Sequence, residues 1–431
     1  MINTWLLDKQ ARLIVEEIPY LKSAALGVYI KLGSRHEKEE MAGASHFIEH
    51  MLFKGTESRS ARDIAESFEE IGGQLNAFTS KEFTCVYART LDENISSAME
   101  IIFDMLFNST FATRDFATEK EVIIEEINIY EDTPDDLIHD LFARNLWQGH
   151  PMGSPILGTL DSVSAFSRDE IFDFYKKCYA PSNMVIAVAG NVDKSHIKEQ
   201  VEKCLARQPL TQVNWPEPKP TEYSSFVRLL EKETEQVQIC LGVPGISYFD
   251  QNRYVQNVMN SILGGGMSSR LFQKIREELG LAYSVFSSPS TYSDTGSYSF
   301  YIGTGPGKIA TFFEALYNEL EFFVSRGVSE REVSRTQQLI KSSMYLGLES
   351  VMNRMSRLGK SLLMYDRVIP VEDVIQEILA VDAGKVQGFS SSILQKPAFS
   401  LAAIGGEGIS QMVGLERRGK DEGAFYPLAL P

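Results

Sequence analysis

The chain has 431 residues, of which 43% are hydrophobic and 23% charged, and its formal net charge at pH 7 is −16. This composition is typical of a globular protein with two or three domains. The negative charge disfavours a nucleic-acid binder, which needs a basic face, and is equally compatible with simple solubility or with attraction of cationic partners.

The chain carries no recognisable targeting signal. Residues 1–20 lack the basic and apolar regions of a signal peptide, and no run of about 18 apolar residues predicts a membrane span. The four cysteines are scattered without C-x-x-C spacing, which predicts reduced core thiols rather than a disulfide framework. We therefore expect a cytoplasmic protein.

The first half of the chain combines strand and helix patterns. In chain order, we predict a strand, a helix, a strand-rich segment and an amphipathic helix at residues 24–32, 61–71, 74–90 and 94–107. Ser60 and Asp63 form an S-x-x-D start signal for the first of these helices, and two glycines follow it.

A proline-rich segment then divides the chain near its midpoint. Four prolines in PLTQVNWPEPKPTEY predict an extended linker at residues 209–223. The second half repeats the order of the first, with a strand, a helix, a strand-rich segment and an amphipathic helix at residues 237–243, 268–279, 282–301 and 308–325. We therefore predict an α+β protein with two related domains, residues 1–208 and 224–431, each an antiparallel-rich sheet with helices packed on one face.

The sequence His46-Phe47-Ile48-Glu49-His50 lies in an apolar, proline-free segment that suits a buried helix. On a helix, His46 and His50 share one face and can bind a single ion, while Glu49 lies on the neighbouring edge. Catalytic zinc needs three protein ligands and an open position for a water molecule, whose proton a nearby carboxylate accepts. A chance histidine pair usually lies on a solvated face, so we favour a zinc site with Glu49 as general base.

A third ligand has to come from another segment. Residues 116–130 predict a helix with four glutamates, at positions 119, 121, 125 and 126, and two of these, Glu119 and Glu126, are seven residues apart on one face. The other histidines have no partner at ligand spacing. These residues alone therefore leave the choice among the four glutamates open.

H-x-x-E-H is the inverzincin signature. The chain resembles the pitrilysin/insulinase zinc peptidases and is most similar to their short-subunit branch, which includes mitochondrial processing peptidase and bacterial processing protease homologues. Further matching segments lie at residues 72–88, 150–158, 181–193 and 264–285. Residues 412–431 match no part of the family pattern.

This resemblance implies roles for particular residues. The third ligand of the family corresponds to Glu126, and a second glutamate that supports the site corresponds to Glu119. The segment Leu75–Thr79 corresponds to an edge strand that pairs with the substrate backbone through Asn76, Ala77 and Phe78, a mode in which main-chain hydrogen bonds give sequence-tolerant affinity.

The resemblance also implies a substrate-binding pair in the second half, Arg276 and Tyr283. The Tyr283 hydroxyl would donate to the oxyanion of the attacked carbonyl, and Arg276 would hold a substrate carbonyl. Family members with both halves duplicated place this pair opposite the metal, so Tyr283 is expected to act in the partner subunit of a homodimer.

We therefore expect a zinc-dependent endopeptidase that cleaves extended or unfolded peptides, with one zinc ion per chain and no nucleic-acid or membrane partner. The alternative is a catalytically silent peptide-binding or assembly subunit of the same fold. The complete set of His46, Glu49, His50 and Glu126 favours the enzyme. A nucleotide-binding protein using the glycines at 264–266 is a third reading, which the missing G-K-[ST] ending disfavours.

Overall fold

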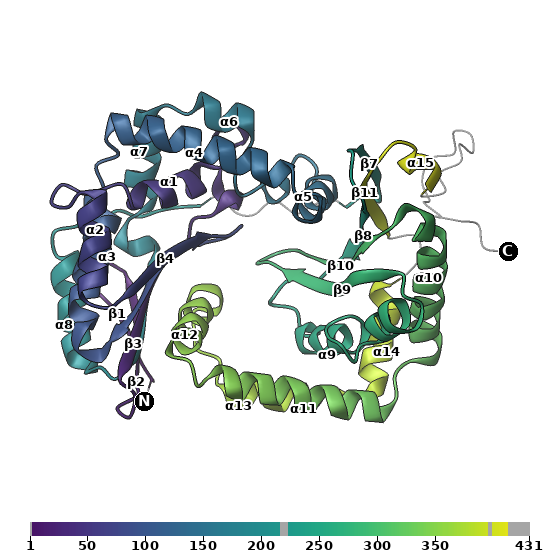
Figure 1. The fold of residues 1–431 in the computed structure, drawn as a ribbon. Coiled ribbons are helices and arrows are strands. Elements are labelled where there is room, and N and C mark those ends of the chain that lie inside the picture. Colours follow the sequence, from purple (N-terminus) through teal and green to yellow (C-terminus); the bar gives the residue numbers. More distant parts are fainter. Residues whose placement is uncertain (1, 216–222, 395–398, 413–431) are drawn as a thin grey trace. The chain divides into compact units, whose positions relative to one another are not determined.

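The computed structural model describes residues 2–215, 223–394 and 399–412, and the chain forms two compact units (Figure 1). Unit 1 comprises Met1–Asn128, Ser154–Glu217 and Met344–Ile369, and unit 2 comprises Ile129–Gly153, Pro218–Ser343 and Pro370–Pro431. Each unit is therefore built mainly from one half of the sequence and includes a segment of the other half.

Unit 1 contains a six-stranded mixed sheet in the order β1-β2-β6-β3-β5-β4. Its strands are β1 (Ile2–Leu6), β2 (Arg12–Glu17), β3 (Ser23–Ile30), β4 (Gln74–Thr79), β5 (Thr84–Leu91) and β6 (Met184–Gly190). β2 and β6 run parallel, and the other neighbouring strands run antiparallel. β4 forms a hairpin with β5 and lies at the edge of the sheet.

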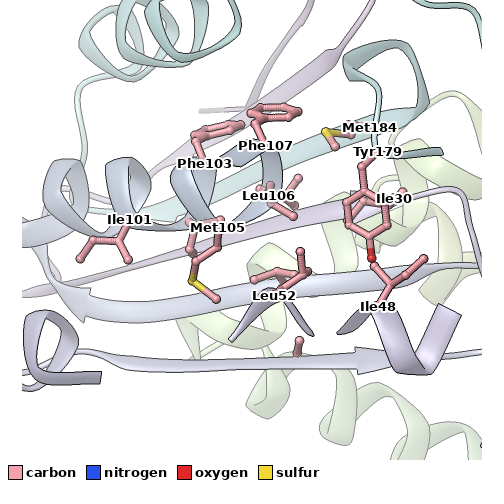
Figure 2. Packing of buried hydrophobic residues seen from close by; sticks show 14 of the residues in the cluster. Ile30, Ile48, Leu52, Ile101, Phe103, Met105, Leu106, Phe107, Tyr179 and Met184 are labelled. Carbon is pink, nitrogen blue, oxygen red and sulfur yellow. The ribbon is translucent and has the colours of Figure 1, made fainter. Parts of the chain in front are cut away.

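Helices cover one face of this sheet and enclose the main core of unit 1. They are α1 (Ala44–Leu52), α2 (Ala61–Glu70), α3 (Ile95–Asn108), α4 (Thr113–Glu131), α6 (Leu160–Ala165), α7 (Arg168–Cys178) and α8 (Lys194–Leu205). Ile48 and Leu52 of α1 join the same buried cluster as Leu106 of α3 and Ile30 of β3 (Figure 2). The motif helix is therefore anchored in the core by its apolar residues.

The opposite face of the same sheet carries a single helix from the second half of the sequence, α12 (Val351–Tyr365). Alternation along β3 directs Tyr29 to this face, where it packs with Met355 and Leu358 of α12. The approach is close because Gly359 has no side chain: a Cβ there would lie 2.1 Å from a ring carbon of Tyr29. Both faces of the sheet are thus buried.

Unit 2 contains a five-stranded mixed sheet in the order β7-β11-β8-β10-β9. Its strands are β7 (Val227–Glu231), β8 (Val237–Pro244), β9 (Ala282–Thr291), β10 (Gly296–Thr304) and β11 (Ser400–Gly405). Its helices are α5 (Pro134–Leu146), α9 (Arg253–Leu263), α10 (Ile309–Arg326), α11 (Glu330–Gly347), α13 (Val371–Leu379), α14 (Ala383–Ile393) and α15 (Ile409–Met412), with a π-helix at Phe272–Glu278.

Two cores also flank this second sheet. The helical layer, which includes α9, α10 and α14, packs on one face. On the other face, Ile138 and Phe142 of α5 pack against Cys240 of β8 and against Ala402 and Ile404 of β11. α5 precedes the chain midpoint, so unit 2 receives a helix from the first half just as unit 1 receives α12 from the second.

The two sheets repeat one pattern. The order β7-β11-β8-β10-β9 matches β2-β6-β3-β5-β4, and in each sheet the first two of these strands are parallel and the rest antiparallel. This confirms the prediction of two related α+β domains with antiparallel-rich sheets. The expected layer of helices lies on one face of each sheet, but α12 and α5 also cover the opposite faces, which the prediction did not include. The predicted domain boundaries at residues 208 and 224 stay a prediction. The compact units do not follow the two halves of the sequence strictly, because α5 from the first half belongs to unit 2 and α12 from the second half belongs to unit 1.

The proline-rich segment is described as far as Trp215, and it forms neither helix nor strand at residues 209–215. The Trp215 indole donates to Asn183 Oδ1 (3.3 Å), and its ring lies 4.4 Å from that of His36. This part of the predicted linker is therefore bound to unit 1. Residues 216–222 lie outside the described residues.

The helix predicted at residues 268–279 is present in part, but it is a π-helix and not an α-helix. Residues 272–278 form a π-helix, and just past its end Leu279 N–H donates to Lys274 O (3.2 Å), five residues earlier. An apolar pattern near 3.6 residues per turn does not distinguish this bonding from that of an α-helix. By contrast, the start signal at Ser60 is confirmed, since Ser60 and Asp63 form a capping box at α2.

All four cysteines are free thiols, and Cys85, Cys178 and Cys240 are buried. Burial raises the pKa of Cys178 and Cys240 to about 12, so these thiols are protonated and unreactive at neutral pH. In the described part of the chain, no helix has the length and apolar character needed to cross a membrane. The cytoplasmic location stays a prediction.

Candidate metal centre

Helix α1 presents the two histidines of the motif. Phe47, Ile48 and Met51 are fully buried, so the helix cannot rotate without exposing them. His46 and His50 lie one turn apart on the remaining face, with their Nε2 atoms 3.2 Å from each other. The first turn is held by Glu37, whose carboxylate accepts from the backbone N–H groups of Gly43 (2.8 Å) and Ser45 (2.6 Å).

Helix α4 places a carboxylate opposite this histidine pair. Glu126 Oε1 lies 3.9 Å from His46 Nε2, and Glu126 Oε2 lies 3.5 Å from His50 Nε2. His46, His50 and Glu126 offer ligand atoms that all lie within 4.8 Å of one another. Glu125, which precedes Glu126 on α4, is exposed. Among the four glutamates left open by the sequence, the geometry therefore selects Glu126.

These spacings fit a zinc ion. Bonds of about 2.0–2.1 Å in tetrahedral geometry place ligand atoms about 3.3–3.4 Å apart. The two histidine nitrogens are 3.2 Å apart, and different oxygens of Glu126 lie 3.9 Å from His46 Nε2 and 3.5 Å from His50 Nε2. With one ligand atom from each residue, all three atoms lie within 4.8 Å of one another, slightly wider than that spacing. Two imidazole nitrogens and one carboxylate are also the donors that zinc accepts at catalytic sites, and three ligands leave a fourth position open.

The ring of His50 is oriented by Glu119, two turns before Glu126 on α4. Glu119 Oε1 lies 2.7 Å from His50 Nδ1, and the Lys54 ammonium lies 2.6 Å from Oε2 of the same carboxylate. Burial alone would raise the pKa of Glu119, but the His50 and Lys54 contacts outweigh it and lower the pKa. An ionised Glu119 accepts a hydrogen bond from the Nδ1–H of His50, and in this tautomer the Nε2 lone pair is directed at the ligand site.

In the described part of the chain, His46 has no carboxylate partner like the one at Nδ1 of His50. Its Nδ1 atom is buried and has no hydrogen-bond partner among the described residues. Burial, together with the neighbouring His50, lowers the pKa of His46 to about 3. The imidazole is therefore neutral at physiological pH, which is the form that binds a metal ion.

Glu49 lies beside the ligand set but outside it. Its Oε2 accepts a hydrogen bond from the Thr79 hydroxyl at the end of β4 (2.5 Å). Burial raises the pKa of Glu49, and the negative charge of Glu126 acts in the same direction. A raised pKa makes this carboxylate a stronger base than an ordinary glutamate, which suits a general base.

The predicted substrate strand is present as β4, which lies at the edge of the sheet, where the Ala77 N–H donates to Asn76 Oδ1 (2.8 Å). Asn76 is exposed, Ala77 is buried in the core, and Phe78 packs on the face that carries α12. The role of these three residues in substrate binding stays a prediction.

Arg276 and Tyr283 lie together in unit 2. The guanidinium of Arg276, in the π-helix, is 4.4 Å from the ring centre of Tyr283 on β9, and Tyr283 is 79% exposed. The contact is a cation–π pair at an exposed position. Their roles toward substrate, in this chain or in a partner subunit, stay predictions.

The sequence did not predict the contacts that Glu37, Lys54 and Thr79 make at the site, although Thr79 lies in the predicted edge strand. Lys54 could have been found, since it lies four residues after His50 and continues the spacing of His46 and His50. Thr79 and Glu37 act through tertiary contacts that no local spacing predicts.

Comparisons with known proteins identify the family of the chain. Residues 12–160 match the family model described as "Insulinase (Peptidase family M16)", and residues 165–340 match "Peptidase M16 inactive domain". A Bacillus subtilis protein named "Uncharacterized zinc protease YmxG" is 41% identical over 95% of this chain and 99% of its own length. The Streptomyces coelicolor "Uncharacterized zinc protease SCO5738" is 38% identical over 90% of this chain and 87% of its own.

Solved structures show the same fold at low sequence identity. A peptidase M16 inactive domain from Pseudomonas fluorescens superimposes with a TM-score of 0.87 at 19% identity, covering 94% of this chain and 98% of that one. A protease from Helicobacter pylori gives a TM-score of 0.87 at 18% identity, with coverage of 94% and 99%. The matched family models and the relatives that are similar over nearly the whole length show that this chain belongs to the insulinase family, peptidase family M16.

Proposed function

We propose that the protein is a zinc-dependent endopeptidase that cleaves extended or unfolded peptides. The observation that carries the proposal is the position of Glu49 next to, but outside, a three-ligand set formed by His46, His50 and Glu126. Family membership and relatives named as zinc proteases support it. We propose one zinc ion per chain, since the described residues offer one such ligand set.

The residues of the site have separate roles in the proposed reaction. His46, His50 and Glu126 would hold the ion, which when bound would polarise the scissile carbonyl and acidify a water molecule. Glu49 would accept the proton of the attacking water and deliver it to the departing amide nitrogen. The Thr79 hydroxyl occupies only one oxygen of Glu49, so the other can take part in proton transfer.

The substrate class follows from the edge strand. A peptide that adds to β4 has to be extended, because only an extended backbone offers N–H and C=O groups at strand spacing. Such a peptide would lie beside the Glu49–Thr79 contact at the end of β4. Arg276 and Tyr283 complete the proposal as substrate-binding residues, with a homodimer as the assembly in which they act.

Glu49→Gln tests the proposal, with Glu70→Gln on the exposed end of α2 as a matched control. Glutamine preserves the shape of Glu49 but cannot accept the proton, so cleavage of an internally quenched peptide should fall by about 10²–10⁴-fold. Zinc content, measured by mass spectrometry, should be unchanged in both variants. Cleavage by the Glu49 variant at the wild-type rate would refute the assignment of the base. A wild-type protein that holds zinc but cleaves no unfolded peptide would favour the silent peptide-binding subunit.

A further inference from the structure

Three residues form a continuous chain that ends at the ligand set. The Lys54 ammonium lies 2.6 Å from Glu119 Oε2, and Glu119 Oε1 lies 2.7 Å from His50 Nδ1. Glu119 is only 3% exposed, whereas the side chain of Lys54 is 35% exposed. A solvent-accessible cation is thus joined through a buried carboxylate to a predicted metal ligand.

The position of Lys54 is fixed by the way α1 ends. Phe53 N–H donates to His50 O (3.2 Å) and Lys54 N–H to Met51 O (3.1 Å), so the chain turns tightly after Leu52. This turn keeps Lys54 within reach of α4. Lys54 and His50 therefore approach the same carboxylate from one end of α1, each at a different oxygen.

A buried carboxylate between two partners has little freedom to rotate. With Lys54 at Oε2, the other oxygen of Glu119 faces His50. Without the ammonium, the carboxylate would be buried with one neutral partner, which is an unfavourable arrangement that rotation or added water would relieve. His46 has no comparable support for its own ring, since its Nδ1 has no hydrogen-bond partner among the described residues. A loss of orientation at His50 would therefore not be offset at the second histidine.

We propose that Lys54 is a positioning residue of the metal centre: its ammonium fixes the Glu119 carboxylate, which in turn directs His50 Nε2 at the ion. The inference rests on the proposed function, because it takes His50 to be a zinc ligand. It assigns Lys54 no contact with the ion or the substrate. Lys54 therefore acts on zinc affinity, and it acts only through Glu119.

The test is zinc affinity, measured by competition with a chromogenic chelator on the full chain. Lys54→Met should weaken zinc binding about 10–100-fold, the range expected when an outer-shell partner of a metal ligand is lost. Lys54→Arg should stay close to wild type, because a guanidinium can pair with the same carboxylate. Lys38→Met, which removes an exposed cation from the loop before α1, should leave the affinity unchanged.

A double-mutant cycle with Glu119→Gln separates positioning from general damage. The glutamine carbonyl can still accept from His50 Nδ1, and a neutral amide needs no cation. Lys54→Met combined with Glu119→Gln should therefore bind zinc as Glu119→Gln does alone. This double variant also buries no unpaired charge, so it reports on Lys54 even where the single methionine variant folds poorly.

Two results would overturn the inference: wild-type affinity in Lys54→Met, or losses that add in the double variant. Failure of the proposed function would look different. In that case the wild-type chain would bind no zinc, or would bind zinc and cleave no peptide, whatever residue stands at position 54.

Discussion

Replacing Glu37 by glutamine should change how the stability of the protein depends on pH. Glu37 is buried, and its carboxylate accepts from Gly43 and Ser45 at the first turn of α1. Burial raises its pKa to about 7 from an ordinary value of 4.5, although these hydrogen bonds oppose the rise. Ionising Glu37 in the folded protein is therefore costly, and glutamine at this position cannot ionise.

The sign and size of the effect follow from this shift. The folded-state pKa lies above the unfolded value, so the contribution of Glu37 to stability is complete below pH 4.5 and is lost as the pH rises through 7. Between pH 5 and pH 8, a difference of this size removes about 2.5 kcal/mol. The free energy of unfolding of the wild type should fall by this amount relative to that of Glu37→Gln.

Urea unfolding of both proteins at several pH values measures the difference. A chelator should be present throughout, because metal binding is itself pH-dependent. Comparison with the variant cancels the contributions of other titrating groups to the pH dependence. These include His46, whose lowered pKa makes the free energy of unfolding rise with pH. A difference that stays constant with pH would refute the reasoning. A difference that grows in favour of the wild type would show that the backbone hydrogen bonds, not burial, control Glu37.

Three further predictions concern the ligand set, the exchanged helix and the net charge. Glu126→Gln should lose most of its zinc while Glu125→Gln keeps it, and metal analysis that gives the reverse would exchange the two roles. Gly359→Ala should cost about 1–3 kcal/mol of unfolding free energy, because its Cβ would lie 2.1 Å from the Tyr29 ring. The control is Gly388→Ala in α14, where an added Cβ would meet no atom of another segment within 4 Å, so this variant should be as stable as the wild type or more stable in the same denaturation assay. Cationic unfolded peptides should be cleaved faster than acidic ones at low ionic strength, with the difference shrinking in salt, and equal rates at low salt would show that the charge of −16 serves only solubility.

The sequence predicted those features that depend on local pattern. Hydrophobic periodicity located α2, α3, α4 and both strand-rich segments, and the spacing of His46 and His50 placed both on one helical face. The choice of Glu126 needed the family resemblance, because spacing alone allowed four glutamates. That choice depends on how α4 packs beside α1, which is a tertiary property.

What the sequence could not predict depends on contacts between distant segments. The exchange of α5 and α12 leaves no local signal, because each helix shows an ordinary amphipathic pattern whichever sheet it covers. The π-helix that carries Arg276 was expected to be α-helical for a similar reason: both helix types place apolar residues on one face. The family resemblance predicted that Glu126 would join His46 and His50, and the structure brings these three together, but the resemblance did not predict the contacts of Glu37, Lys54 and Thr79 around them.

The register of β4 connects the proposed base, Glu49, to the proposed substrate strand. Side chains alternate along a strand, so Ala77 and Thr79 point to the helical layer, where Thr79 donates to Glu49, whereas Phe78 points to the face of α12. The hairpin fixes this register by pairing Thr79 with Thr84, whose hydroxyl donates to Leu32 O (2.8 Å). A slip of one residue would bring Phe78 to Glu49 and remove the hydrogen bond that orients it. A peptide added to β4 would use its backbone edge and leave the Thr79 side chain in place. In the proposed mechanism, the same strand would align the scissile bond and hold Glu49, and a change in its register would disturb both at once.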